Sequence, residues 1–191
     1  MAESDRIRSF IAVAVPPESA EGLREAQERL RAVEPRIKWV NPDGFHITLK
    51  FLGGVEPQRL SALWNAVSEA LDGLMAFTMR FRGLGAFPSA DRARVVWAGV
   101  NDGADELIEI AKRIEQVGGK HGFEMESRPF TAHLTLGRAR EAGSNPALAA
   151  AIQEMAGAEL GQVRLDRVLL MRSELTRQGA IYHELEQKLL G

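Results

Sequence analysis

The chain repeats one order of predicted elements after a constant interval of 87 residues. Each half contains a histidine, an apolar residue, a threonine and a leucine in succession, at 46–49 and at 133–136. Adding 87 to the expected element starts at 17, 57 and 76 gives 104, 144 and 163, which mark the corresponding elements of the second half. Independent origins would not preserve several loop lengths. The interval therefore predicts an internal duplication, roughly 7–83 and 94–171, with pseudo-twofold symmetry.

Helices are expected where apolar residues recur every three or four positions, and strands where β-branched residues or alternation dominate. Ala20, Leu23, Ala26 and Leu30 form such a helical stripe, which Pro35 ends. The first half is expected to contain strands 6–15, 37–40, 45–52 and 76–82, helices 17–33 and 57–71, and a turn at 41–44. The second half is expected to contain strands 94–100, 130–138 and 163–171, helices 104–117 and 146–155, a polar bend at 172–179 and a last strand at 180–185.

Two halves that face each other would bring their histidine-bearing strands to opposite sides of one cleft. Helices would then cover the outer faces of two mostly antiparallel sheets. The sequence therefore predicts a bilobal α+β fold whose pseudo-twofold-related halves surround a central cleft. The chain contains no flexible linker, so we expect a single domain over residues 1–191 with interleaved lobes.

Composition excludes several classes of protein. The absence of cysteine rules out disulfides, thiolate metal sites and a cysteine nucleophile, and is typical of a cytoplasmic protein. The formal net charge of −2 argues against a broad cationic surface for long duplexes, so nucleic-acid contacts should be local and short. The first residues are polar and acidic, and no apolar run is long enough to span a bilayer. We expect a monomer that is neither secreted nor inserted in a membrane.

Alternate residues of an extended strand share a face, so each motif presents a histidine and a threonine on one side. The polar pairs are His46 with Thr48 and His133 with Thr135, and the apolar partners expected in the core are Ile47, Leu49, Leu134 and Leu136. The chain has only four histidines and five threonines, so chance explains two such pairs poorly.

Two histidines on opposite sides of a phosphate are suited to the cleavage of a cyclic phosphodiester by water. The attacking water must lose a proton while the leaving alkoxide gains one, and imidazole, with an unperturbed pKa near ~6.5, can fill either role. Thr48 and Thr135 would donate hydrogen bonds to the non-bridging oxygens. Symmetry does not say which histidine is the acid. The scheme needs no metal or cofactor, and the sequence lacks a His-Glu-x-x-His motif.

Each of these residues also has a structural interpretation. A single strand histidine is usually a satisfied core or edge residue, and threonine favours strands without any further task. The duplicated pairing favours function over these alternatives, because several levels of the pattern agree. His121 and His183 have no threonine partner, so we expect surface or structural roles for both.

Two basic residues lie next to the motifs, and six aromatic residues elsewhere in predicted strands are further candidates. Lys50 continues the alternation toward the cleft, with a solvated charge as the alternative. Arg138, just after Gly137, would curl back toward the phosphate with its planar fork of donors. Aromatic rings grip single-stranded bases by stacking, but strand aromatics are more often core residues. The candidates that could do either are Phe10, Trp39, Phe45, Trp97, Phe130 and Tyr182.

Four stretches together resemble one known family: residues 8–13, 45–53, 128–138 and 173–182. They are similar to the RNA 2′,3′-cyclic phosphodiesterases of the 2H phosphoesterase superfamily, also known as 2′-5′ RNA ligases. The resemblance covers nearly the whole chain, and both His-x-Thr-Leu motifs are complete. It implies a bilobal α+β fold and metal-independent opening of terminal 2′,3′-cyclic phosphates to 2′-phosphates, with reversible 2′-5′ joining of RNA ends in some members. It also implies that His46 is the proton donor and His133 the proton acceptor.

The leading hypothesis is that the protein is an enzyme that hydrolyses 2′,3′-cyclic phosphates. Its partners would be RNA ends or small nucleotides that carry such a phosphate. Within enzymes, the alternatives are 2′-5′ RNA ligation and hydrolysis of a small cyclic sugar phosphate. A non-catalytic module that binds RNA ends is the alternative from another class. The intact histidines and threonines of both motifs argue against that module.

Overall fold

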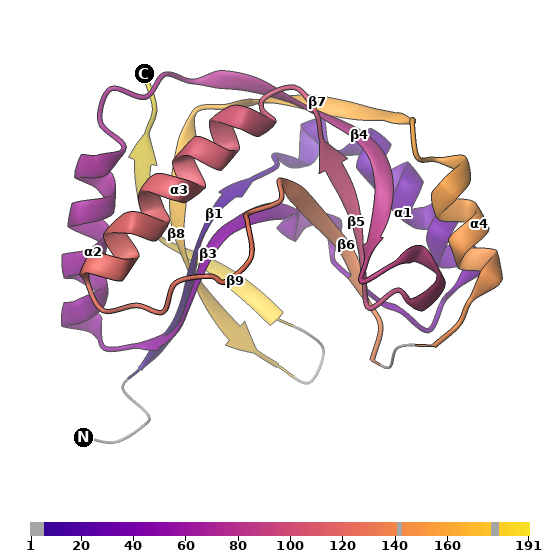
Figure 1. Ribbon diagram of the computed structural model, residues 1–191, viewed down its shortest axis with the longest axis horizontal. Coiled ribbons are helices and arrows are strands. Elements are labelled where there is room, and N and C mark those ends of the chain that lie inside the picture. The colour runs from indigo at the N-terminus through magenta and orange to yellow at the C-terminus, as the bar shows by residue number, and fades with distance from the viewer. Residues whose placement is uncertain (1–5, 141–142, 177–179) are drawn as a thin grey trace.

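The computed structural model describes residues 6–140, 143–176 and 180–191, whose strands form two antiparallel sheets (Figure 1). The first sheet has the order β3-β1-β8-β9, and the second has the order β2-β6-β5-β4-β7. The first comprises β1 (Ile7–Ala14), β3 (His46–Val55), β8 (Arg167–Leu175) and β9 (Ala180–Leu189). The second comprises β2 (Lys38–Trp39), β4 (Phe77–Phe87), β5 (Val95–Val100), β6 (His133–Arg138) and β7 (Glu159–Leu165).

The described residues contain four α-helices, which lie on the outer sides of the two sheets (Figure 1). They are α1 (Glu21–Val33), α2 (Pro57–Ala70), α3 (Ala104–Lys120) and α4 (Pro146–Glu154). Helices α2 and α3 pack together and α3 contacts β3, whereas α1 contacts β7 and α4. The predicted α+β class with two antiparallel sheets and outer helices is therefore confirmed. None of these helices is long and apolar enough to cross a bilayer.

The two halves of the sequence are interwoven between the sheets. Strand β4 comes from the first half but pairs with β5 and β7, whereas β8 comes from the second half and pairs with β1. Helices α1 and α3 are exchanged in the same way, since α3 of the second half contacts β3 of the first half and α1 of the first half contacts β7 of the second. Elements related by the 87-residue interval thus change places, as a pseudo-twofold axis would require. The duplication and the single domain stay predictions, which this arrangement supports.

The strand predicted at 163–171 is wrong, because these residues belong to two strands. Strand β7 ends at Leu165 in the second sheet and β8 begins at Arg167 in the first. The chain therefore crosses between the sheets at Asp166. Leu165 and Val168, on either side of the crossing, are both buried. Buried apolar residues on both sides of Asp166 read as one strand in the sequence, although the pairing partners change there.

Several predicted boundaries also shift. The polar bend predicted at 172–179 is wrong at 172–175, because β8 continues to Leu175 and pairs with β9. Cross-strand pairing outweighs the polar composition there. Residues 177–179 of that bend lie outside the described residues. The helix predicted at 17–33 opens as a 3-10 turn, Pro17–Ser19, before α1 begins, and the strand predicted at 76–82 extends to Phe87.

Candidate active site

His46 is the first residue of β3, and the preceding turn holds its ring. Its Nδ1 lies 2.7 Å from the Gly44 carbonyl oxygen, so Nδ1–H donates a hydrogen bond and Nε2 is left for chemistry. Gly44 ends the 3-10 turn Pro42–Gly44, which Asn41 caps by accepting a hydrogen bond from the Asp43 amide. The turn residues at 41–44 therefore fix the orientation of the imidazole.

Two aromatic rings enclose His46 within the first sheet. The Phe10 ring of β1 lies 5.1 Å from the imidazole between centroids, and the Tyr182 ring of β9 lies 4.9 Å away, edge-on. Phe10 and Tyr182 also contact each other at 5.3 Å. Burial lowers the pKa of His46, and the hydrogen bond to the Gly44 carbonyl partly opposes that shift.

His133 is the first residue of β6 and repeats this arrangement in the second sheet. Its Nδ1 lies 2.7 Å from the carbonyl oxygen of Thr131, again two residues earlier in the chain. The rings of Phe87 and Trp97 lie 5.2 and 6.2 Å from the imidazole. Trp97 stands 87 residues after Phe10, so the two cages share an equivalent aromatic position. Burial lowers the pKa of His133 as well.

The threonines lie where the period of the strand places them, on the same side as the histidines. Thr48 is opposite Ala12 of β1, and Thr135 is opposite Trp97 of β5. The apolar residues between the polar ones are buried: Ile47, Leu49, Leu134 and Leu136. Each motif therefore anchors its strand in the core through one face and presents a hydroxyl and an imidazole on the other.

Lys50 does not face the cleft. A β-bulge shifts the register of β1 and β3 between Ile11 and Ala12, so Lys50 pairs with Ile11 and turns toward the core. Lys50 is 2% exposed, and its Nζ donates to Glu115 Oε2 and to the Glu124 carbonyl oxygen, each 2.8 Å away. The cleft-facing lysine is therefore a wrong prediction, and so is the solvated charge. Lys50 instead joins β3 to α3 through a buried ion pair.

The second motif strand contains an equivalent bulge, which turns Arg138 toward the histidine side. The register of β5 and β6 shifts between Val96 and Trp97. Gly137 therefore pairs with Val96, which is fully buried, and Arg138 pairs with Val95. Arg138 needs no curled backbone to reach the cleft, because the bulge alone changes its face.

Arg138 lies within electrostatic reach of both motif histidines. Burial is the larger cause of their lowered pKa values, and the Arg138 guanidinium lowers the pKa of His46 and of His133 further. Strands β3 and β6 also approach each other, although they belong to different sheets. The structure thus brings the two predicted motifs together around one cation, which is suited to hold a phosphate.

Phe51 is a functional candidate that the sequence analysis missed. It stands 87 residues before Arg138, directly after the bulge of β3. Phe51 is 53% exposed, and its ring lies 6.0 Å from the ring of Phe10. Strict alternation from His46 assigns position 51 to the core. The 87-residue interval, which aligns Phe51 with the cleft candidate Arg138, was the signal that could have found it.

The six aromatic candidates divide into two groups. Those next to a motif histidine are Phe10, Trp97 and Tyr182. Those that pack into or against the core are Trp39, Phe45 and Phe130. Phe87, which the sequence analysis did not select, completes the cage of His133. Gly85 makes room for this cage, because a Cβ there would clash with the Trp97 ring.

The remaining histidines take no part in this arrangement. His121 Nδ1 lies 3.0 Å from the Val117 carbonyl oxygen at the end of α3, and His183 lies 3.5 Å from Glu174 on the β8–β9 hairpin. Over residues 6–140, 143–176 and 180–191, no cluster of three or more histidine, cysteine, aspartate or glutamate side chains is arranged to hold a metal ion.

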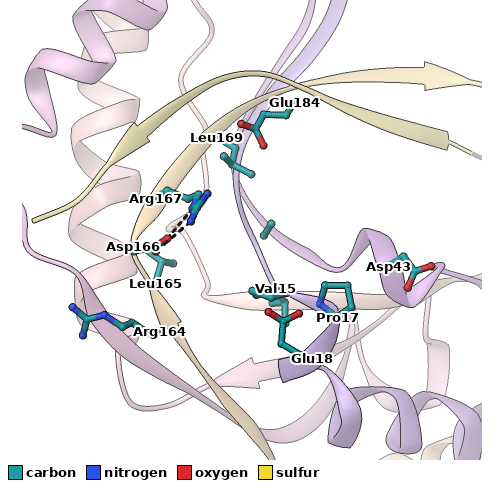
Figure 2. A pocket seen from close by; sticks show the side chains of 12 residues that line it. Val15, Pro17, Glu18, Asp43, Arg164, Leu165, Asp166, Arg167, Leu169 and Glu184 are labelled. Atoms are coloured by element: carbon teal, nitrogen blue, oxygen red, sulfur yellow. Dashed lines mark hydrogen bonds and ion pairs between the residues drawn. The ribbon is translucent and has the colours of Figure 1, made fainter.

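A pocket of about 460 Å³ lies between the end of β1, the segment 16–18 and the crossing from β7 to β8 (Figure 2). One wall includes Ala14, the cross-strand neighbour of His46, and another is the crossing between β7 and β8 at Asp166. Arg167 Nε donates to Asp166 Oδ1 at 2.8 Å, as Figure 2 shows. Charges of both signs line the pocket, namely Glu18, Asp43, Asp166, Glu184, Arg164 and Arg167. No pattern in the sequence predicts this pocket.

Comparison with known proteins matches one family in both halves of the chain. The model of the LigT like Phosphoesterase family matches residues 13–97 and again residues 99–182. A curated protein of Methanothermobacter thermautotrophicus named RNA 2′,3′-cyclic phosphodiesterase is 34% identical over 181 residues, which are 95% of this chain and 97% of that protein. A protein of Aeropyrum pernix with the same name is 41% identical over 149 residues, or 78% of this chain and 84% of that one.

Solved structures show the same fold over almost the whole chain. A protein from Thermus thermophilus superposes with a TM-score of 0.80 at 27% identity, covering 96% of this chain and 98% of that chain. E. coli LigT in complex with 3′-AMP superposes with a TM-score of 0.76 at 28% identity, covering 97% of this chain and 98% of that chain. The two-sheet architecture described above is therefore that of known structures.

Proposed function

Because this chain belongs to the LigT-like phosphoesterase family, we propose that it is an RNA 2′,3′-cyclic phosphodiesterase that opens the terminal cyclic phosphate to a 2′-phosphate. The observation that carries the proposal is the approach of β3 to β6, the strands that bear the two His-x-Thr motifs, with Arg138 on the histidine side of β6. The names of the curated relatives support the choice of substrate. RNA ends and small nucleotides that bear a 2′,3′-cyclic phosphate are the proposed ligands.

In the proposed step, His133 Nε2 accepts a proton from a water molecule that attacks phosphorus. The new phosphorus–oxygen bond forms as the bond to the 3′-oxygen breaks, and His46 Nε2 donates a proton to that oxygen. The product carries a 2′-phosphate and a free 3′-hydroxyl. His133 then loses its proton to solvent and His46 regains one. The assignment of donor and acceptor follows the family resemblance, while the geometry supplies two equivalent Nε2 atoms.

The phosphate is held by groups that carry or offset charge. Thr48 and Thr135 are proposed to donate hydroxyl hydrogen bonds to the non-bridging oxygens, where negative charge resides in the transition state. Arg138 adds a guanidinium that can bind two of these oxygens at once. All three side chains are on strands that the core fixes in place, so little reorganisation is needed when the substrate binds.

The lowered pKa values suit this division of labour. Burial and Arg138 favour neutral imidazoles in the free protein, which prepares His133 to accept a proton. An anionic phosphate bound beside Arg138 offsets the cation and raises the pKa of His46, so the donor becomes protonated when substrate is present. The hydrogen bonds from Nδ1–H to the backbone carbonyls keep Nε2 of each ring available in both states.

The proposed function is tested by incubating the protein with a 2′,3′-cyclic nucleotide, with and without a chelator, and separating the products by chromatography. We expect a 2′-phosphate as the product and the same rate in both samples, because the scheme uses only side chains. A 3′-phosphate product would contradict the proposed roles of the leaving and attacking groups. Loss of turnover in the chelator would contradict a reaction without metal.

A further inference from the structure

Two cations lie directly opposite each other where β2 pairs with β6. The register places Lys38 across from Arg138 and Trp39 across from Gly137. Lys38 and Arg138 are both exposed, and neither has an ion pair with any carboxylate within the described residues. Like charges at directly opposed positions destabilise a strand pair. The described part of the protein therefore leaves this repulsion without a compensating anion.

The register also puts Lys38 on the same side of the sheet as the catalytic candidates. Residues directly opposite each other share a face, and Arg138 lies between Lys38 of β2 and Val95 of β5. Val95 is two residues from Trp97, whose ring lies beside His133. Lys38 therefore extends the row that begins at His133 and Arg138, and it does so at the outer edge of the sheet.

Two further cations border this row. Arg94 immediately precedes β5, Arg140 follows β6, and both are exposed. The Ala139 amide donates to the Arg94 carbonyl at 2.9 Å, so these two segments are adjacent. Arg36 differs, because Glu34 binds it at 2.7 Å and has its pKa lowered to about 2 by that contact. We call Lys38, Arg94, Arg138 and Arg140 the cationic edge.

We propose that Lys38 binds the phosphodiester next to the reacting phosphate, on its 5′ side, and so makes the protein prefer an RNA end over a mononucleotide. The inference rests on the proposed function, since Arg138 is taken to hold the reacting phosphate. The Cβ atoms of directly opposite residues lie about 5 Å apart. This spacing suits two successive phosphates along one RNA strand. Lysine is a flexible point charge, so the contact would position the backbone without reading sequence.

The choice of a phosphate strand over an isolated anion follows from the extent of the edge. A cyclic mononucleotide with a free 5′-hydroxyl offers one negative charge, which Arg138 alone can match. An RNA end repeats that charge at every nucleotide, and the row of cations continues from Arg138 to Lys38 on the adjacent strand β2. The net charge of −2 leaves no general attraction for RNA, so a local row of cations has a measurable effect.

The test compares Lys38→Met with Lys120→Met, which removes an equivalent exposed charge from the end of α3. The substrates are a single-stranded RNA oligonucleotide with a 2′,3′-cyclic phosphate and the cyclic mononucleotide of the same terminal base. The measured quantity is kcat/KM for the oligonucleotide divided by kcat/KM for the mononucleotide. Lys38→Met should lower this ratio about tenfold, because KM for the oligonucleotide rises. The dependence of log kcat/KM on log salt for the oligonucleotide should become shallower by about 1. Lys120→Met should change neither quantity.

Separate outcomes distinguish the two proposals. If the wild-type protein turns over neither substrate, the proposed function fails. The role of Lys38 is then tested by fluorescence anisotropy with an oligonucleotide that ends in a 2′-phosphate, where an unchanged Kd in Lys38→Met would overturn the inference. If the wild type is active and Lys38→Met leaves the substrate ratio unchanged, only the inference fails. The Tm of Lys38→Met should not fall, since the substitution removes a like-charge pair, so unfolding cannot imitate the expected result.

Discussion

The two motif strands hold their histidines alike and differ just after the threonine. In both, Nδ1 lies 2.7 Å from the carbonyl oxygen two residues earlier, and in both an aromatic ring of the neighbouring strand flanks the imidazole. Both strands then contain a bulge at equivalent positions. Beyond the bulge the core-facing residue is Lys50 in β3 and Gly137 in β6, and the cleft-facing residue is Phe51 or Arg138.

This difference shows that the two strands are equivalent where they would transfer protons and differ where they would bind the substrate. The attacking and leaving oxygens lie on opposite sides of phosphorus, and the same imidazole arrangement can serve each side. The substrate itself has no such symmetry, because charge and nucleobase lie in different directions from the reacting atom. A cation in one strand and an exposed ring in the other match that asymmetry. The core-facing positions differ because Lys50 fills the space below α3, whereas a Cβ at Gly137 would lie 2.7 Å from the Trp39 ring.

The largest expected effect comes from removing either of the symmetric histidines. His46→Ala and His133→Ala should each lower kcat on the order of 10⁴-fold, because each removes one of two required proton transfers. Circular dichroism should show that both variants remain folded. His121→Ala is the matched control and should keep full activity. Full activity in either motif variant would contradict the two-histidine mechanism.

The threonines test whether the two motifs bind the phosphate equally. Thr48→Ala and Thr135→Ala should each lower kcat/KM roughly 10²-fold, by analogy with the removal of one oxyanion donor. Thr→Ser at each position keeps the hydroxyl and should recover most of the loss. Normal turnover per folded molecule in both alanine variants would assign the threonines to packing alone.

A substitution of the buried Lys50 tests the difference between the two motif strands on their core-facing side. Lys50→Met leaves Glu115 without its cationic partner, so the free energy of unfolding in urea should fall by about 3 kcal/mol. Adding Glu115→Met should restore part of this loss, because no unpaired charge then remains. A single variant as stable as the wild type would show that the ion pair between β3 and α3 contributes nothing.

Substitutions of the exposed Phe51 test the difference between the two motif strands on their cleft-facing side. If Phe51 stacks the terminal base, Phe51→Ala should raise KM for a cyclic nucleotide about tenfold and leave kcat nearly unchanged. Phe51→Trp keeps a stacking surface and should retain most of the affinity. Equal loss of affinity in both variants would place the base elsewhere.

The smallest expected effect is a shift along the pH axis. Arg138 lowers the pKa of both histidines. In Arg138→Met, the midpoints of both limbs of the pH profile of kcat/KM should therefore shift to higher pH. Arg138→Lys keeps the charge and should keep the wild-type midpoints. An Arg138→Met profile with the same midpoints as the wild type would remove Arg138 from the electrostatics of the site.

The two-residue period of a strand correctly predicted which side chains of the motifs are buried and which share the opposite face. The faces of His46 and His133 and the burial of Ile47 and Leu134 follow from the two-residue repeat of a strand. That repeat fails at a bulge, which is why it misplaced Lys50 and missed the exposed ring of Phe51.

Long-range features were beyond the same reasoning. The crossing at Asp166 joins two buried strands whose sequences read as one, and only the pairing partners reveal the change of sheet. The exchange of β4 and β8 between sheets likewise depends on contacts far apart in the chain. The cage around His46 includes Tyr182, which the sequence placed among six equal candidates because it does not show that the strand of Tyr182 pairs with β8 and so joins the sheet that contains β1 and β3.

The most direct test of the central claim is the pH dependence of kcat/KM for the wild type, His46→Gln and His133→Gln, measured with the same cyclic substrate. We expect a bell-shaped wild-type profile, since a base must be neutral and an acid protonated. His46→Gln should lose the fall toward high pH, because that limb reports deprotonation of the acid. His133→Gln should lose the rise from low pH, because that limb reports deprotonation of the base. Profiles in which neither variant loses a limb, or in which both lose the same one, would contradict one acid and one base on opposite sides of the phosphate.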